Sequence, residues 1–193
     1  MASTAPLMSD VLVVAECWQA ETDAEAVIHR AIATAAEIAD ADHGEAELAV
    51  MLTDDEGIRT LNSNWRGIDK PTNVLSFPAL PPTGPRGPDD APRMLGDIAI
   101  AYQTTRREAD AEHKPFEHHL SHLAVHGYLH LIGYDHENDA DADLMEGLET
   151  EILAQLGIPD PHSDPDPYSD PDPHSDPDPH AERDSDKDPE RMD

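Results

Sequence analysis

The stretch His126-Gly-Tyr-Leu-His130-Leu-Ile-Gly133-Tyr-Asp-His136 combines three histidines with a glycine that can end a helix. His126 and His130 are four residues apart on a predicted helix, so their imidazoles project from the same face. Gly133 allows the chain to leave that helix in a left-handed conformation and to turn back, which brings His136 toward the other two rings. Three neutral imidazoles with an open fourth position suit a catalytic Zn²⁺ that activates water.

The same spacing occurs in the HExxHxxGxxH pattern of the metzincin proteases, at all three histidines and at the glycine. That pattern has a glutamate, the general base, at the position where this chain has Gly127. Without the carboxylate, peptide hydrolysis by the usual route lacks its proton acceptor. The stretch therefore predicts a metal site and argues against a protease.

Two residues near this stretch are candidates for supporting roles. His122 lies one helical turn before His126 and is expected beside the metal ligands. Asp135 either orients a ligand imidazole or forms a turn. Each step of four residues also rotates about 40° around a helix, so we expect His118 and His119 to be solvated.

Outside this stretch, hydrophobic periodicity and turn residues predict a mixture of strands and helices. Asp23 is a candidate N-cap, and Thr53-Asp-Asp-Glu56 has the form of a capping box. We expect strands at 10–15, 47–52, 74–77 and 96–101, helices at 24–41, 53–65, 104–111, 117–131 and 139–156, and a proline-rich surface loop at 81–92. The order of these elements lacks strict βα alternation, which favours an α+β fold with a small mixed sheet of about four strands flanked by helices.

Charge is unevenly distributed along the chain. The 193 residues include 12 Lys and Arg against 42 Asp and Glu, a formal net charge of −30. So acidic a chain argues against a simple nucleic-acid-binding surface, because its carboxylates repel phosphates. Its few cations concentrate before the Pro-Thr segment at 71–72 and before the histidine helix, which predicts a small positive groove there: Arg59, Arg66, Lys70, Arg106, Arg107 and Lys114.

Composition divides the chain into three expected segments. Residues 1–8 are expected to be a disordered extension, residues 9–158 the folded domain, and residues 159–193 a disordered acidic tail. The tail repeats Asp-Pro-Asp-Pro, which offers no apolar face and removes backbone donors. Weak metal binding by the tail histidines is the alternative to an inert tail.

The chain has a single cysteine, Cys17, so it has no intrachain disulfide and no cysteine-based zinc cluster. Its apolar run near the start is too short to span a bilayer, and a basic patch followed by an apolar stretch is missing there. We therefore expect a cytoplasmic protein.

Three motifs in this order closely resemble the YbeY family, the bacterial rRNA maturation factors regarded as metal-dependent, single-strand-specific endoribonucleases. They are Pro71-Thr-Asn-Val-Leu-Ser-Phe-Pro78, Leu95-Gly-Asp-Ile98 and the histidine stretch. The resemblance covers roughly residues 8–158. It implies a zincin-like α+β fold and one Zn²⁺ per chain, held by His126, His130 and His136. It also implies a role in 16S rRNA 3′-end processing and ribosome quality control, with the small ribosomal subunit or its proteins as partners. We expect a monomer.

The resemblance also assigns roles outside the histidine stretch. The family's arginine before the Pro-Thr segment falls on Arg66, which would bind the scissile phosphate with its forked guanidinium; the alternative is an ordinary exposed arginine at a helix end. Ser76 would contact substrate or cap a backbone group. Asp97 would orient a ligand histidine or merely begin a strand.

Several alternatives remain open at this level. The nucleophile is either a zinc-bound water or the 2′-hydroxyl of the RNA. Two other functions compete with RNA cleavage: a zinc metallopeptidase or other hydrolase, and a non-catalytic ribosome-assembly factor with a structural zinc. Three imidazoles without a fourth protein ligand argue against a purely structural zinc, which is normally four-coordinate.

Overall fold

The computed structural model describes residues 7–39, 45–79, 92–136 and 139–161 of the chain. Residues 81–91 of the loop expected at 81–92, the first six residues and the tail beyond residue 161 lie outside the described residues. The strands are β1 (Leu7–Val13), β2 (Ala46–Thr53), β3 (Val74–Pro78) and β4 (Arg93–Ala101). The helices are the short 3₁₀ helix η1 (Glu16–Ala20) and α1 (Ala24–Ile38), α2 (Asp55–Arg66), α3 (Tyr102–Ala111), α4 (Phe116–Leu131) and α5 (Asp139–Gln155).

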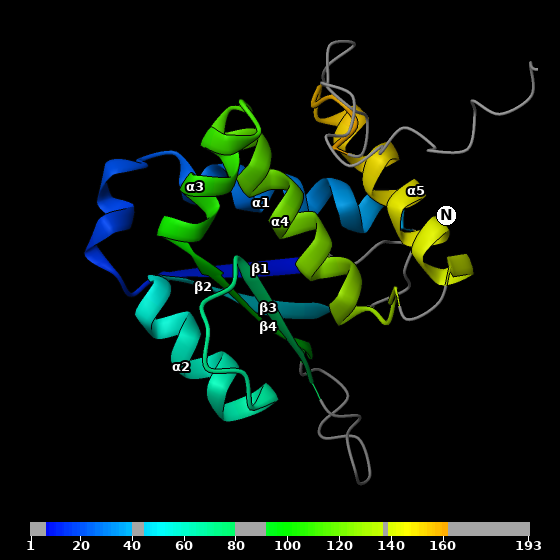
Figure 1. Ribbon diagram of the computed structural model, residues 1–193. Helices are drawn as coiled ribbons and strands as arrows, with labels where there is room; N and C mark the ends of the chain where they lie inside the picture. The colour runs from blue at the N-terminus through cyan, green and yellow to red at the C-terminus, as the bar shows by residue number, and fades with distance from the viewer. Residues whose placement is uncertain (1–6, 40–44, 80–91, 137–138, 162–193) are drawn as a thin grey trace, which may run out of the picture. The chain divides into compact units, whose positions relative to one another are not determined.

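The four strands form one mixed sheet in the order β1-β2-β4-β3. β1, β2 and β4 are parallel, and β3 runs antiparallel to β4 at the edge. Helices α1 and α4 cover one face of the sheet, and α2 lies on the other face (Figure 1). The expected α+β fold with a four-stranded mixed sheet is confirmed. β1 begins at Leu7, so the last two residues of the expected extension 1–8 belong to this strand.

The core lies between the sheet and α1 and α4. In β2, alternate residues point into it and are buried: Ala46, Leu48, Val50 and Leu52. This alternation is the period-2 pattern of a strand with one face on the core. A smaller apolar cluster under α2 consists of Ile58, Leu75, Ala99 and Ala101. The sheet is thus packed on both faces, and each side chain of β3 and β4 points either to the α1 and α4 face or to the α2 face.

The start of α2 differs from the expected capping box. The cap is Asp54, whose Oδ1 accepts a hydrogen bond of 2.8 Å from the N–H of Gly57. Thr53 cannot serve, because it is still the last residue of β2 and is buried, and its carbonyl accepts a hydrogen bond from the Trp18 indole. At the other end Gly67 takes a left-handed φ of 70° and ends the helix directly after Arg66.

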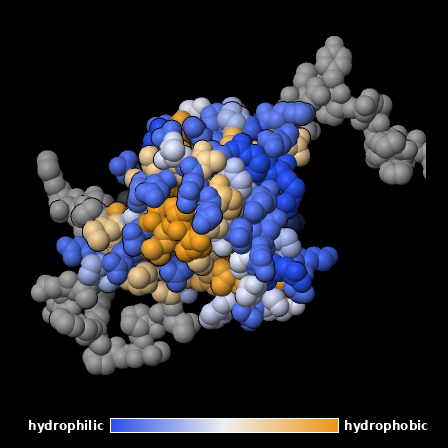
Figure 2. Space-filling model, turned by 90° about the vertical axis from the view of Figure 1, so that its left-hand side faces the viewer, coloured by the Kyte–Doolittle hydropathy of each residue, from blue (hydrophilic) through white to orange (hydrophobic). Residues whose placement is uncertain are grey.

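β1 is the other edge of the sheet, and several of its apolar side chains are exposed: Met8, Leu12 and Val13. An apolar area surrounded by hydrophilic residues is visible on one side of the molecule (Figure 2). Among the described residues, no helix is both long and apolar enough to cross a membrane.

Helix α4 lies unusually close to the sheet at Gly127. A Cβ added to this residue would lie 2.9 Å from Cγ2 of Ile98 on β4. Ile98 is fully buried and β-branched, so it has little freedom to move aside. Position 127 therefore has no room for a side chain, which is the structural reason that the protease glutamate has no counterpart here.

This contact predicts opposite effects of the same substitution at two helical glycines. Gly127→Ala should lower the free energy of unfolding by about 1–3 kcal/mol, because it overpacks the interface between α4 and β4. Gly147→Ala on α5 meets nothing within 4 Å and should raise stability by up to about 1 kcal/mol through helix propensity. Urea titrations followed by circular dichroism would measure both values; a Gly127→Ala protein as stable as the wild type would contradict the close packing.

Candidate functional site

The three histidines of the predicted metal site come together. His126 and His130 lie on the same face of α4, and Gly133, with a φ of 100°, turns the chain after the helix. This turn brings His136 back, so that one ring nitrogen from each histidine lies within 4.8 Å of the others. His126 and His130 are partly buried, and His136 is exposed. The group could therefore bind a metal ion at an open site.

The hydrogen bonds of His126 show which of its nitrogens faces the other histidines. Its Nδ1 lies 2.7 Å from Oε1 of Glu149 and therefore carries the proton, because a carboxylate only accepts. The neutral ring then has its lone pair on Nε2, which lies 3.1 Å from Nε2 of His130. Two nitrogens at this distance fit adjacent ligands of a tetrahedral ion with bonds of about 2.0–2.1 Å.

Glu149, which contacts His126, is a residue of this site that was not predicted from the sequence. It lies on α5 and is only 2% exposed. Its Oε2 lies 3.4 Å from Nε2 of His122, so one carboxylate contacts two histidines of α4. Burial alone would raise the pKa of Glu149, but hydrogen bonds from His122 and His126 and the electrostatic attraction of these rings outweigh it and hold the pKa well below its usual range. The available clue was an acidic residue within the apolar stripe of a helix.

Burial also acts on the second histidine of the group. It lowers the pKa of His130, and the neighbouring His126 and His136 lower it further. A lowered pKa keeps this imidazole neutral at pH 7, the form in which it can bind a metal ion.

A cavity of about 570 Å³ opens beside the histidines. It is lined by all three of them and also by Arg66 and Ser76. Arg66 ends α2, is exposed, and makes no ion pair or hydrogen bond within the part of the chain that the structure describes. The cavity thus combines a group that could bind a metal ion with an arginine that is available for an anion.

The other predicted site residues take different places. Ser76 lines the cavity and donates a hydrogen bond of 3.2 Å to the carbonyl of Gly127, which ties β3 to α4. Asp135 also lines it, and its Oδ1 accepts a hydrogen bond of 2.8 Å from the N–H of His136, as a turn-forming aspartate does. Asp97 is exposed on β4 opposite Phe77. It therefore points to the α2 face, away from the histidines.

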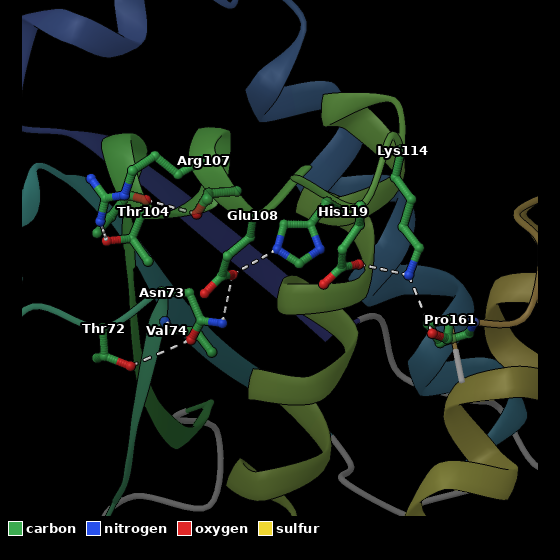
Figure 3. A network of polar contacts seen from close by, with 12 residues as sticks. Thr72, Asn73, Val74, Thr104, Arg107, Glu108, Lys114, His119 and Pro161 are labelled. Carbon is green, nitrogen blue, oxygen red and sulfur yellow. Dashed lines mark hydrogen bonds and ion pairs between the residues drawn. The ribbon is translucent and has the colours of Figure 1, made fainter. Parts of the chain in front are cut away.

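A second network holds the chain segment that enters β3 (Figure 3). Oε2 of Glu108 on α3 accepts hydrogen bonds from the Asn73 amide, at 2.9 Å, and from Nε2 of His119, at 2.8 Å. His119 is 6% exposed, so the expectation that it is solvated is wrong. Asn73 lines the cavity next to Thr72. The network therefore fixes one wall of the site to α3 and α4.

Most of the cations expected to form a positive groove are neutralised. Arg66 is the only one of the six that lines the cavity, and Lys70 is exposed. The other four each pair with a carboxylate: Arg59 with Asp69, Arg106 with Glu21, Arg107 with Asp55 and Lys114 with Glu112. The groove predicted from sequence is thus reduced to one arginine at the cavity, because these carboxylates lie beside the cations in the folded chain.

The contact between Glu149 and His126 predicts a loss of metal affinity on substitution. Glu149→Gln keeps the size of the side chain but removes the charge that fixes the protonated Nδ1, and Zn²⁺ affinity should fall about 10- to 100-fold. Glu146→Gln, an exposed change on the same helix, is the control. Competition with a chromophoric chelator measures both; equal affinities would show that Glu149 does not orient the ligand.

The Glu108 network predicts a pH-dependent contribution to stability. Burial would raise the pKa of Glu108, but His119, Asn73 and Arg107 together lower it. The unfolded chain therefore takes up the proton first as the pH falls, so the stabilisation is complete above the unfolded pKa of about 4.3 and is lost below it. Glu108→Gln should destabilise the protein at pH 7 and have a smaller effect near pH 3.5, because the stabilisation declines as the pH falls toward the lowered pKa of the folded state. Urea unfolding at both pH values tests this; an equal loss at both would contradict it.

Comparison with known proteins agrees with the geometry. A model of the family described as endoribonuclease YbeY matches residues 14–157. The endoribonuclease YbeY of Bradyrhizobium sp. strain BTAi1 is 76% identical over 81% of this chain and 92% of its own length. That of Rhodopseudomonas palustris strain BisB18 is 73% identical over 82% of this chain and 94% of its own.

A solved structure also matches the fold. The solution structure of TM1509 from Thermotoga maritima is 25% identical, with a TM-score of 0.51 over 82% of this chain and 98% of its own. Family match, identity and fold agree over the part of the chain that contains the three histidines and Arg66. The chain belongs to the endoribonuclease YbeY family and is a hydrolase that acts on RNA.

Proposed function

We propose that this protein is a zinc-dependent, single-strand-specific endoribonuclease that acts in 16S rRNA 3′-end maturation and in late ribosome quality control. The observation that carries the proposal is the cavity that Arg66 lines together with His126, His130 and His136. Such a cavity can hold a phosphodiester between a metal ion and a guanidinium, both of which stabilise the negative charge that develops during cleavage.

The three imidazoles are the proposed zinc ligands. Bound Zn²⁺ supplies a Lewis acid that polarises a phosphate oxygen or lowers the pKa of a water molecule. Glu149 holds the His126 ring so that Nε2 faces the site. Arg66 is the proposed catalytic residue, because its fork can donate to two non-bridging phosphate oxygens and it has no competing partner among the described residues.

A general base at the protease position is excluded by packing, since Gly127 lies against Ile98. Asp135 is the carboxylate that lines the cavity within the described chain, and one of its oxygens already accepts from the His136 backbone. The attacking group is therefore either water or the substrate's own 2′-hydroxyl. End-group analysis of cleaved RNA distinguishes the two, because a 2′,3′-cyclic phosphate arises only from attack by the 2′-hydroxyl.

The acidity of the chain bears on its partners. With a formal charge of −30 and one arginine in the cavity, the protein has little to attract free RNA at long range. We propose that it meets its rRNA substrate on the small ribosomal subunit, where ribosomal proteins supply the contacts that hold it.

Arg66 provides the central test. With purified, zinc-loaded protein and a single-stranded RNA that spans the 3′ end of precursor 16S rRNA, Arg66→Ala should lower kcat/KM about 10²- to 10³-fold with zinc content unchanged. Arg59→Ala is the matched control, since Arg59 lies on the same helix but pairs with Asp69 outside the cavity. Full activity of Arg66→Ala would exclude its role at the phosphate.

The biological role needs a cellular measurement. In a deletion strain, wild-type protein should restore mature 16S 3′ ends and His130→Ala should not. Normal maturation with His130→Ala would favour the alternative of a non-catalytic assembly factor. Casein cleavage that requires His126, without RNA cleavage, would favour a metallopeptidase.

A further inference from the structure

The two tryptophans of the chain have opposite environments. Trp18 is 2% exposed and its indole N–H donates to the carbonyl of Thr53. Trp65 is 73% exposed, more than any other large apolar side chain among the described residues. Its indole N–H has no acceptor within the part of the chain that the structure describes. Exposing an indole forgoes the free energy of burying a large ring, so this position calls for a contact outside the chain.

Trp65 is held beside the proposed phosphate site. It directly precedes Arg66 in the last turn of α2. Its ring packs against Phe77 of β3, with centroids 5.7 Å apart and planes inclined by 58°. Phe77 in turn stands between Ser76 and Pro78, which both line the cavity. The indole therefore packs on a second ring, and both rings adjoin residues that line the cavity. Arg66 follows Trp65, and Ser76 and Pro78 flank Phe77.

The position of β3 at the edge of the sheet allows an RNA strand to pass from the histidines to Trp65. Phe77 points to the α2 face of the sheet and Ser76 to the α4 face, where the histidines lie. β3 is an outermost strand of the sheet, so a chain that runs from the histidines past Arg66 to Trp65 crosses only its free edge. A strand of RNA whose phosphate lies at Arg66 can place a neighbouring base over the indole.

The charge of the protein makes this contact valuable. The cavity contributes one unpaired arginine within the described chain, and the other cations near it are paired or solvated. Stacking on an aromatic face needs no positive charge and accepts every base, because each base has a π-face. It also requires an unpaired base that can be splayed from its neighbours, which a duplex does not offer.

We infer that Trp65, backed by Phe77, is the platform on which a base next to the scissile phosphate stacks. This inference rests on the proposed function, since it places an RNA strand across Arg66. Trp65 is a binding and specificity residue, and it gives the enzyme its preference for single strands over duplex.

The test compares Trp65 variants on matched substrates. Trp65→Ala should raise KM for a short single-stranded RNA about tenfold or more with a smaller change in kcat. Trp65→Phe, which keeps an aromatic face, should have a KM close to that of the wild type. Ile68→Ala is the control, because Ile68 is also exposed, at 49%, but has no π-face. When the nucleotide beside the cleavage site is abasic, KM of the wild type should be higher than for the intact RNA, and KM of Trp65→Ala should be the same for both RNAs.

Fluorescence provides a readout independent of cleavage. RNA should quench the emission of the wild type and leave that of Trp65→Phe, which retains only the buried Trp18, unchanged. The inference is overturned if Trp65→Ala has the wild-type KM, or if the substitution raises KM by the same factor for the abasic and the intact RNA. In the second case Trp65 would be a contact for a ribosomal protein or a structural residue. If the wild type cleaves no RNA at all, the proposed function fails rather than the stacking platform.

Discussion

The close approach of α4 to β4 at Gly127 and Ile98 sets the geometry of the whole site. Because the helix lies so near the sheet, the Gly127 carbonyl comes within reach of Ser76, and β3 is fixed to the helix that carries the histidines. His126 and His130, one residue before and three residues after Gly127 on the same helix, are only partly buried and line the cavity. The close approach also removes the space for a carboxylate at position 127. One packing contact thus both brings β3 to the helix that carries the histidines and leaves no room for the proton acceptor of a peptidase.

Two carboxylates of the protein each contact two side chains. The buried Glu149 is shared by His122 and His126, and Glu108 is shared by Asn73 and His119. Each carboxylate joins two secondary-structure elements and is satisfied by neutral or weakly basic donors rather than by the scarce arginines. Arg59 and Arg107 are themselves exposed where they pair with Asp69 and Asp55, and such surface pairs add little stability. Arg66 alone brings an unpaired cation to the cavity within the described chain.

Much of this could be predicted from sequence, and the rest could not, for identifiable reasons. Strands and helices have local hydrophobic periods, so their positions followed within a few residues; the histidine site followed because its ligands and the turn at Gly133 are close in sequence. Glu149 and His119 were missed or misplaced because their partners come from other helices. The prediction of a positive groove was wrong partly for the same reason: the carboxylates that neutralise Arg106 and Arg107 are Glu21 and Asp55, which precede them by many residues and meet them only in the folded chain.

The site is assembled from two halves with separate origins. The metal half comes from α4, its following turn and α5, and the phosphate half from the end of α2 and from β3. The two halves meet where Ser76 binds the carbonyl of Gly127. In the proposed function, metal binding therefore depends on α4 and α5, and phosphate binding on α2 and β3. A molecule that held its metal would still fail to cut RNA if β3 shifted, so metal analysis alone would not measure how many molecules are able to cut RNA.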